Sequence, residues 1–170
     1  MMKRKIVDKN NVQIYSSQER VRRDETIWTL VQAILAPIQF FVFIISLFLV
    51  LRFLVTGLGY EAATISIVIK TIILYIIMIT GAIWEKTVFG QYLLAKSFFW
   101  EDVVSFFVIA FHSLYLFVLF TNFLNQNYLI GIALIAYFIY LVNAIQFLIK
   151  FKLAKKTQLK DISSADGVMT

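Results

Sequence analysis

Three acidic residues border one short connection between two long apolar runs. The stretch WEKTVFGQYLLAKSFFWED, residues 84–102, has Glu85 near one end and Glu101 with Asp102 at the other. Burial near hydrocarbon disfavours the charged form of a carboxyl group, so such a group can hold a proton near neutral pH. These three residues are therefore candidates for general acid–base chemistry, in which one carboxyl group gives a proton and another accepts one.

The only histidine of the chain continues the same pattern. Glu101, Ser105, Val108 and His112 follow a 4-3-4 spacing, which puts them on one face of a helix. At 1.5 Å per residue, His112 lies about 16 Å deeper than Glu101. One imidazole cannot build a histidine metal cage within one chain. By its position alone, His112 could also be a neutral core histidine that bonds a neighbouring helix.

Composition indicates which elements must position these residues. The 170 residues are 61% hydrophobic and only 15% charged, with a mean hydropathy of +0.82, which is typical of a membrane protein. The absence of cysteine excludes disulfides, thiolate metal sites and cysteine nucleophiles. The first 28 residues are polar where a signal peptide needs an apolar core, so we expect no cleaved targeting segment.

Four stretches have the roughly 20 apolar residues that a helix needs to cross a membrane. They lie near 30–54, 63–83, 102–123 and 127–149. The breaks at 56–61 and 121–127 are short and carry glycine or asparagine, as tight turns do. The sequence thus predicts an all-α membrane protein, a four-helix antiparallel bundle. It divides into a basic N-terminal segment (1–29), a transmembrane domain (30–149) and a basic tail (150–170).

Basic residues flank the spans unevenly. They are Lys3, Arg4, Lys5, Lys9, Arg20, Arg22 and Arg23 before the first span, Lys86 and Lys96 in the middle connection, and Lys150, Lys152, Lys155, Lys156 and Lys160 after the last span. The positive-inside rule places both termini and the middle connection in the cytoplasm. The net charge of +6 then reflects topology and attraction to anionic lipids. We expect no nucleic-acid binding, because no stacking platform accompanies these residues.

Polar residues inside the spans gather toward the cytoplasmic end. Gln32 and Gln39, seven apart, share a face of the first span, and Asn143 and Gln146, three apart, share a face of the fourth. Together with the acids they predict a polar chamber that opens toward the cytoplasm. An ionisable residue at the centre of a span costs roughly 2.5–3.5 kcal/mol on insertion, so such residues usually serve a function.

Each of these residues also has a structural interpretation. Trp84 and Trp100 suit an aromatic belt at the membrane boundary. Glu101 and Asp102 would complement the positive end of a helix dipole, and the amides would bond neighbouring helices. We interpret Lys70, in the second span, as reaching outward to the membrane surface along its flexible stem.

Three stretches carry a resemblance to a known family: RVRRDETIWTLVQAILAPIQFFVF (20–43), KTIILYIIMITGAIWEKTVFGQYLLAKSFFWEDVVSFFVIAFHSLYL (70–116) and YLVNAIQFLIK (140–150). Over roughly residues 20–150 the chain resembles the C3-vinyl bacteriochlorophyllide hydratases. The resemblance implies a multi-pass enzyme of a bacterial inner membrane, cytoplasmic or photosynthetic, in bacteriochlorophyll biosynthesis. Such an enzyme adds water to the C3-vinyl group of a chlorophyllide and yields a 3-(1-hydroxyethyl) group. A non-catalytic pigment or lipid carrier is the alternative.

The implied reaction assigns roles to the polar residues. Proton delivery to the vinyl CH2 is followed by addition of water, with Glu85, Glu101, Asp102 and His112 as the candidate catalytic groups. His112 could be a base or an axial ligand of the pigment's own magnesium. The protein itself needs no cofactor and no metal.

The same reaction implies a substrate site and partners. Arg22, Arg23 or Lys86 could pair with the propionate of the pigment. The remaining candidate binding residues are Trp84, Trp100, Gln32, Gln39, Ser105, Asn143 and Gln146. The expected partners are a magnesium chlorophyllide or bacteriochlorophyllide, the lipid bilayer and other enzymes of pigment biosynthesis.

The predicted topology can be tested with reporters. A reporter fused after Thr170 should score as cytoplasmic, because basic residues flank the first and last spans. An exoplasmic score would overturn both the topology and the cytoplasmic opening of the chamber.

Overall fold

The computed structural model describes residues 14–166, with side chains up to residue 159. Within this range the chain forms five helices: α1 (Ser17–Glu25), α2 (Ile27–Thr56), α3 (Tyr60–Phe89), α4 (Phe99–Thr121) and α5 (Gln126–Asp166). The first thirteen residues of the expected N-terminal segment, with Lys3, Arg4, Lys5 and Lys9, lie outside the described residues. The last four residues of the tail and the Lys160 side chain also lie outside.

Four of these helices confirm the expected spans. Helices α2 to α5 are each long and apolar enough to cross a membrane. Each begins before its expected apolar window, and all except α4, which ends at Thr121, also continue past the end of the window. The longest extension is that of α5, which continues to Asp166 as a polar helix. Residues such as lysine and glutamine favour helix almost as well as leucine, so the helix does not end where the apolar run ends.

Helix α1 was not among the expected elements. Ser16 accepts a hydrogen bond from the Glu19 backbone N–H, and the Glu19 carboxylate accepts one from the Ser16 backbone N–H. This reciprocal pair is a capping box, which starts a helix by satisfying backbone donors at its first turn. The sequence SQER therefore marks a short polar helix directly before the first span.

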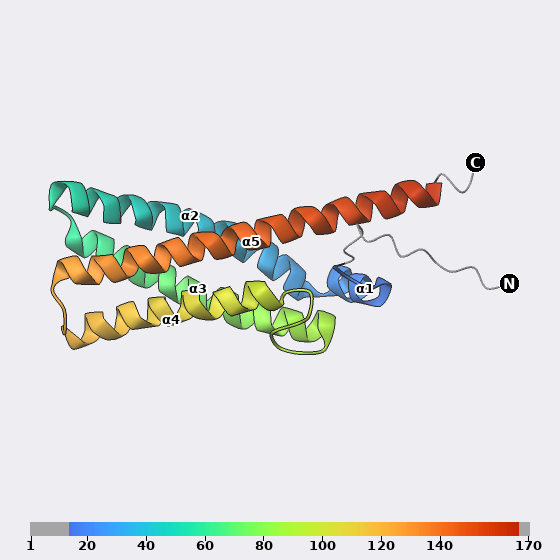
Figure 1. Cartoon of the computed structure of the whole chain (residues 1–170), viewed down its shortest axis with the longest axis horizontal. Coiled ribbons are helices and arrows are strands. Elements are labelled where there is room, and N and C mark those ends of the chain that lie inside the picture. The colour runs from blue at the N-terminus through green and yellow to red at the C-terminus, as the bar shows by residue number, and fades with distance from the viewer. Residues whose placement is uncertain (1–13, 167–170) are drawn as a thin grey trace.

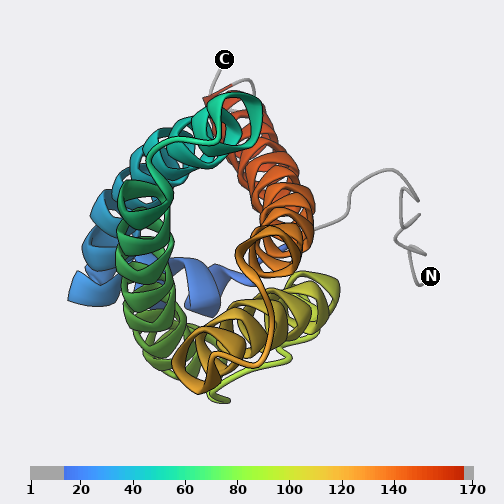
Figure 2. The same ribbon diagram turned by 90° about the vertical axis from the view of Figure 1, so that its left-hand side faces the viewer.

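The four long helices lie side by side (Figure 1). The α2–α3 and α4–α5 connections share one end of the molecule, whereas α1 and the α3–α4 connection lie at the other end (Figure 1). Helix α2 packs mainly against α3, and α4 mainly against α5, while α2 and α5 touch much less. Viewed along their axes, the helices form a ring in the order α2, α3, α4 and α5 (Figure 2). The seam between α2 and α5 is therefore among the loosest of the bundle.

Glycine makes the α2–α3 turn possible. Gly57 ends α2 with a φ of 70°, and Gly59 precedes α3 with a φ of 87°. Both values lie in the left-handed region, where a side chain would be strained. The two helices can therefore reverse direction within three residues.

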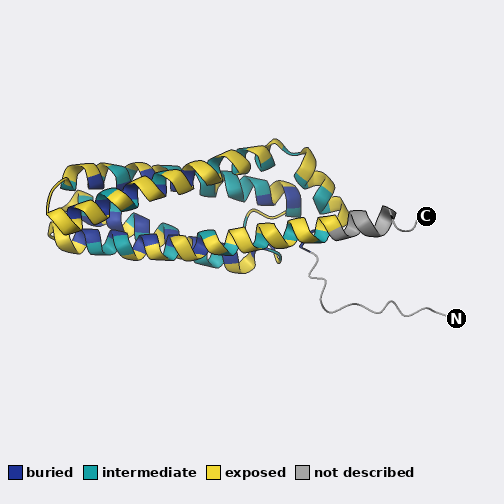
Figure 3. Ribbon diagram, turned by 90° about the horizontal axis from the view of Figure 1, so that it is seen from above, coloured by how far each residue is buried: buried dark blue, intermediate teal, exposed yellow. Residues whose placement is uncertain are grey.

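The residues that face inward are buried, and those that face outward are exposed and mostly apolar (Figure 3). The main core includes Val50, Ile67, Tyr115 and Ile130, one from each long helix. Exposed apolar side chains suit a hydrocarbon surround, in which lipid takes the place of water.

A smaller apolar cluster lies at the end of the bundle that carries α1 and the α3–α4 connection. Tyr15 and Phe98 pack beside Trp84, whose indole N–H donates to Thr29 Oγ1 at 2.9 Å. Burial raises the pKa of Tyr15 to about 12, and the Arg23 guanidinium lies 4.9 Å from the centre of its ring. The segment before α1 is thus fixed against the ends of α3 and α4.

Candidate functional site

The carboxyl groups of Glu85, Glu101 and Asp102, here called the acid cluster, are all buried at the α3–α4 end. Those of Glu85 and Asp102 lie close enough to repel each other when both are ionised. Each also accepts a hydrogen bond from the backbone of the connection. The donors are Ala95 N–H to Glu85 Oε2 at 3.2 Å and Leu94 N–H to Asp102 Oδ2 at 2.7 Å. Two of the acids therefore hold the connection in shape.

Glu101 joins this cluster to α5. Its Oε1 lies 3.2 Å from Lys150 Nζ, which also donates to the Ser97 carbonyl at 2.5 Å. The Glu101 carbonyl accepts hydrogen bonds from Ser105 Oγ at 2.8 Å and from Asn143 Nδ2 at 2.9 Å. Ser105 and Asn143 thus meet at the acid cluster as the sequence predicts. Their polar atoms join α4 to α5, which agrees with the structural interpretation of in-span amides.

The predicted polar face of α4 is confirmed. Glu101, Ser105, Val108 and His112 are 7%, 2%, 1% and 0% exposed, so the whole row faces the interior. His112 Nδ1 lies 2.7 Å from the Val108 carbonyl oxygen. A carbonyl can only accept, so Nδ1 carries the proton of the neutral ring and Nε2 has a free lone pair.

Lys70 donates a hydrogen bond to that lone pair. Its Nζ hydrogen-bonds His112 Nε2, and it lies 4.0 Å from the ring centre of Tyr140 and 4.9 Å from that of Tyr137. The side chain is 0% exposed, so the expectation that it reaches outward is wrong. We call this contact the Lys70–His112 pair.

The sequence does contain a signal for the inward direction of Lys70. Ala63, Ile67, Lys70 and Leu74 follow the same 4-3-4 spacing as the face of α4, and all four are buried. Helical periodicity places them on one face, because residues three and four apart lie above one another. The position of Lys70 on the buried face of α3 determines that its side chain points inward, although the stem is long and flexible enough to reach outward.

The two glutamines of α2 both bond α3. Gln32 Nε2 donates to Thr80 Oγ1 at 2.8 Å, and Gln39 Nε2 donates to the Lys70 carbonyl at 3.4 Å. Gln39 is only 2% exposed, and its Oε1 has no hydrogen-bond partner among the described residues. A buried acceptor next to the backbone of Lys70 therefore has no donor among the described residues.

Several other expected binding residues lie at the edge of the molecule. Arg22 is exposed beside a shallow hollow of α1, and Arg23 pairs with Asp24 at 2.7 Å. Lys86 Nζ donates to the Gly90 carbonyl at 2.8 Å, and Trp100 is 68% exposed. The structure does not bring these residues together with the buried acids.

Gln146 of α5 is half-buried, with an unpartnered Oε1 among the described residues. No group of three or more histidine, aspartate or glutamate side chains in the described range is arranged to hold a metal ion.

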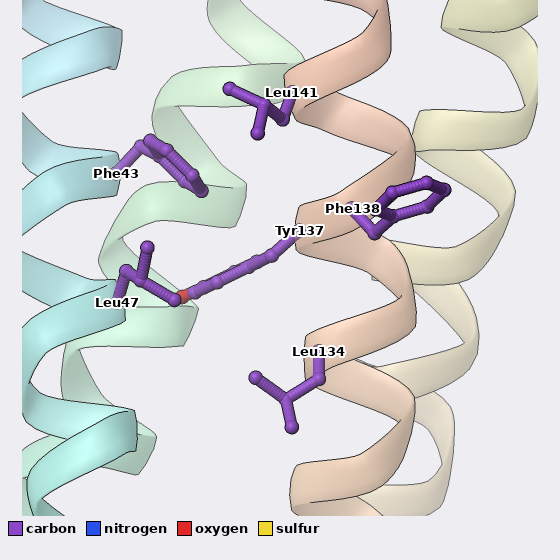
Figure 4. A pocket seen from close by; sticks show the side chains of 6 residues that line it. All are labelled: Phe43, Leu47, Leu134, Tyr137, Phe138 and Leu141. Carbon is purple, nitrogen blue, oxygen red and sulfur yellow. The ribbon is translucent and has the colours of Figure 1, made fainter.

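An apolar groove lies between α2 and α5 (Figure 4). It has a volume of about 190 Å³ and is lined by Phe43, Leu47, Leu134, Tyr137, Phe138 and Leu141. The Tyr137 ring projects across the groove toward α2, and its other neighbours include the His112 ring, stacked at 6.0 Å. The Lys70–His112 pair therefore lies directly behind the wall of the groove.

The acid cluster and the Lys70–His112 pair are two separate polar centres. Lys70 precedes Glu85 by fifteen residues of α3, which is about 22 Å along the helix. The acids meet at one end of the bundle, as the sequence predicts, and His112 lies deeper along α4, as its spacing from Glu101 predicts.

The fold and these centres define a class: a multi-pass α-helical membrane protein with ionisable side chains buried between its spans. The family model for 2-vinyl bacteriochlorophyllide hydratase matches residues 15–153. A 2-vinyl bacteriochlorophyllide hydratase of Rhodobacter capsulatus is 63% identical over 142 residues, which cover 84% of this chain and 82% of the relative. One of Cereibacter sphaeroides is 61% identical over 142 residues, covering 84% and 88%.

The chain belongs to the 2-vinyl bacteriochlorophyllide hydratase family. No solved structure matches it. The match begins before α1 and ends within α5, so it includes every residue of both polar centres.

The burial of Lys70 can be tested by chemical labelling. In mild detergent, a water-soluble amine-reactive reagent should modify the exposed Lys86 and Lys152 and leave Lys70 unmodified, as read by peptide mass spectrometry. Denaturing the protein first should make all three lysines react, which controls for peptide detection. Equal labelling of Lys70 and Lys86 in the folded protein would contradict the inward position.

Proposed function

We propose that this protein hydrates the vinyl group of a bacteriochlorophyllide in bacteriochlorophyll biosynthesis. Its identity of 63% to a relative named for this activity, over most of both chains, carries the proposal. The vinyl arm numbered 2 in the family name is the substituent that we call the C3-vinyl group.

Hydration needs three things from the protein. A general acid protonates the terminal CH2, and the positive charge that forms on the neighbouring carbon spreads into the macrocycle. Water then adds to that carbon and loses a proton to a base, which leaves a 1-hydroxyethyl group. A flat apolar slot must hold the ring. Hydration involves no net oxidation or reduction, so the protein needs no redox cofactor of its own. The magnesium belongs to the substrate.

We assign the proton chemistry to Glu85, Glu101, Asp102 and His112. The acid cluster lies at the end of the bundle that carries α1 and its basic residues (Figure 1). We place this end and both termini in the cytoplasm of a bacterial inner membrane, with the spans antiparallel, because the basic residues flank the spans on this side. The buried face of α4 then leads from cytoplasmic water to His112.

Basic residues at this end suit the propionate of the pigment. Arg22, Arg23 and Lys86 all lie near the ends of α1 and α3, and an arginine fork matches a carboxylate. Substrate would enter with its acidic arm toward the cytoplasm and its vinyl edge toward the interior.

Labelled water tests the activity directly. Membranes that contain the protein, incubated with a 3-vinyl chlorophyllide in H2(18)O, should yield a pigment heavier by one labelled water. Membranes from cells without the protein serve as the control. A protein that binds the pigment and forms no such product would instead be a carrier.

The acid cluster gives a second prediction. Glu85→Gln, Glu101→Gln and Asp102→Asn should each lower hydration about 100-fold, the usual contribution of general acid–base catalysis, while the protein still inserts. Glu61→Gln, an exposed acid at the other end of α3, is the matched control and should keep wild-type turnover. Wild-type turnover in all three cluster variants would leave the acids with only their hydrogen bonds to the connection.

A further inference from the structure

We propose that Lys70 is a catalytic residue, and that the α2–α5 groove admits the vinyl edge of the macrocycle to the Lys70–His112 pair. The inference rests on the proposed function and revises one part of it. Lys70 replaces the acids as the proton donor at the vinyl group, and the acid cluster, about 22 Å away along α3, serves only proton exchange at the end of the bundle.

The position of Lys70 first indicates a role in chemistry. No acidic side chain forms an ion pair with it in the described part of the chain, and its Nζ is held only by His112 Nε2 and by aromatic rings. A buried lysine without a carboxylate partner is costly, and ionisable residues within spans are usually functional for that reason. A purely structural contact at this depth could be made at lower cost by apolar side chains.

The hydrogen bonds of His112 also limit its role. Nδ1 donates to the Val108 carbonyl, and the Nε2 lone pair accepts from Lys70. Axial ligation of the pigment's magnesium would need that lone pair and would have to displace Lys70. The geometry therefore favours a proton-exchanging pair over a metal ligand.

The groove lies next to this pair and is separated from it by the rings that line its wall. Phe43 and Tyr137 line it, and the same two rings lie 5.9 Å and 4.9 Å from Lys70 Nζ. Its 190 Å³ is below the roughly 300 Å³ of a typical small-molecule pocket, so it suits one edge of a ring and not a whole macrocycle. The rest of the ring would lie against the exposed apolar side chains of α2 and α5, such as Phe40 and Phe138.

An unused acceptor completes the centre. Gln39 Oε1 is buried without a partner among the described residues, and its amide group is fixed to the carbonyl of Lys70. A buried oxygen of this kind needs a donor, and a water molecule that bonds it would lie next to the backbone of Lys70. Gln39 is then the residue that positions the water that adds.

The step balances without any further reactant. The Lys70 ammonium gives a proton to the terminal CH2, and the vinyl π electrons form the new C–H bond. The water oxygen bonds the cationic carbon, and its extra proton returns to the Lys70 amine directly or through His112 Nε2. The pair ends with the proton count it began with.

Replacement of the amine tests the proposal. Lys70→Met keeps an unbranched apolar stem and removes the terminal nitrogen, so hydration should fall at least about 100-fold while pigment affinity changes less than about twofold. Thr71→Val, a buried neighbour whose hydroxyl bonds only its own helix, is the matched control and should keep wild-type turnover. If the wild type hydrates the pigment and Lys70→Met does so equally, the inference fails and the proposed function stands. If the wild type forms no product, both fail.

A pair of variants on α5 tests the entry of the ring through the groove. This test does not depend on Lys70→Met, so it remains available if that variant does not insert into the membrane. Leu134→Trp fills the groove and should raise KM at least about tenfold, whereas Ile135→Trp, its exposed neighbour outside the groove, should not. Equal kinetics for the two variants would overturn the entry of the ring between α2 and α5.

Discussion

A lysine nitrogen within the hydrocarbon layer needs a partner, because there is no water to solvate it. In this protein the partner is the imidazole of His112, and the contact joins α3 to α4. Phe43 of α2 and Tyr140 of α5 place their rings around the same nitrogen. One buried atom therefore has neighbours from all four spans. The register of each helix relative to the others is constrained by this centre.

At the end of the bundle, the acid cluster accepts hydrogen bonds from the backbone of the α3–α4 connection. The α3–α4 connection has backbone N–H groups at Leu94 and Ala95 that no helix satisfies, and two buried carboxyl groups accept them. Glu101 and Lys150 then tie the connection to α5. Under the proposed function, the same acids also exchange protons with water outside the membrane. A loss of activity in an acid variant therefore needs the insertion control to be interpreted.

Much of this architecture follows from periodicity in the sequence. The apolar runs predict the four spans, and the 4-3-4 spacing predicts the buried face of α4 down to His112. Periodicity shows which face of its own helix a residue occupies, and it does not show which residue of another helix it meets. For that reason the Lys70–His112 contact could not be predicted, although the row from Ala63 to Leu74 already indicates that Lys70 faces inward. The partners of Glu85 and Asp102 were missed for a related reason, since they are backbone groups of the connection.

The central claim is that Lys70 and His112 act as one unit at the reacting vinyl group. A double-mutant cycle measures this most directly, with Lys70→Met, His112→Gln and the double variant compared to wild type in turnover of a 3-vinyl chlorophyllide. Residues that act as a unit give non-additive losses. The account predicts that the double variant loses about as much turnover as either single variant. Losses that multiply would contradict it, because they would mean that the two residues contribute independently.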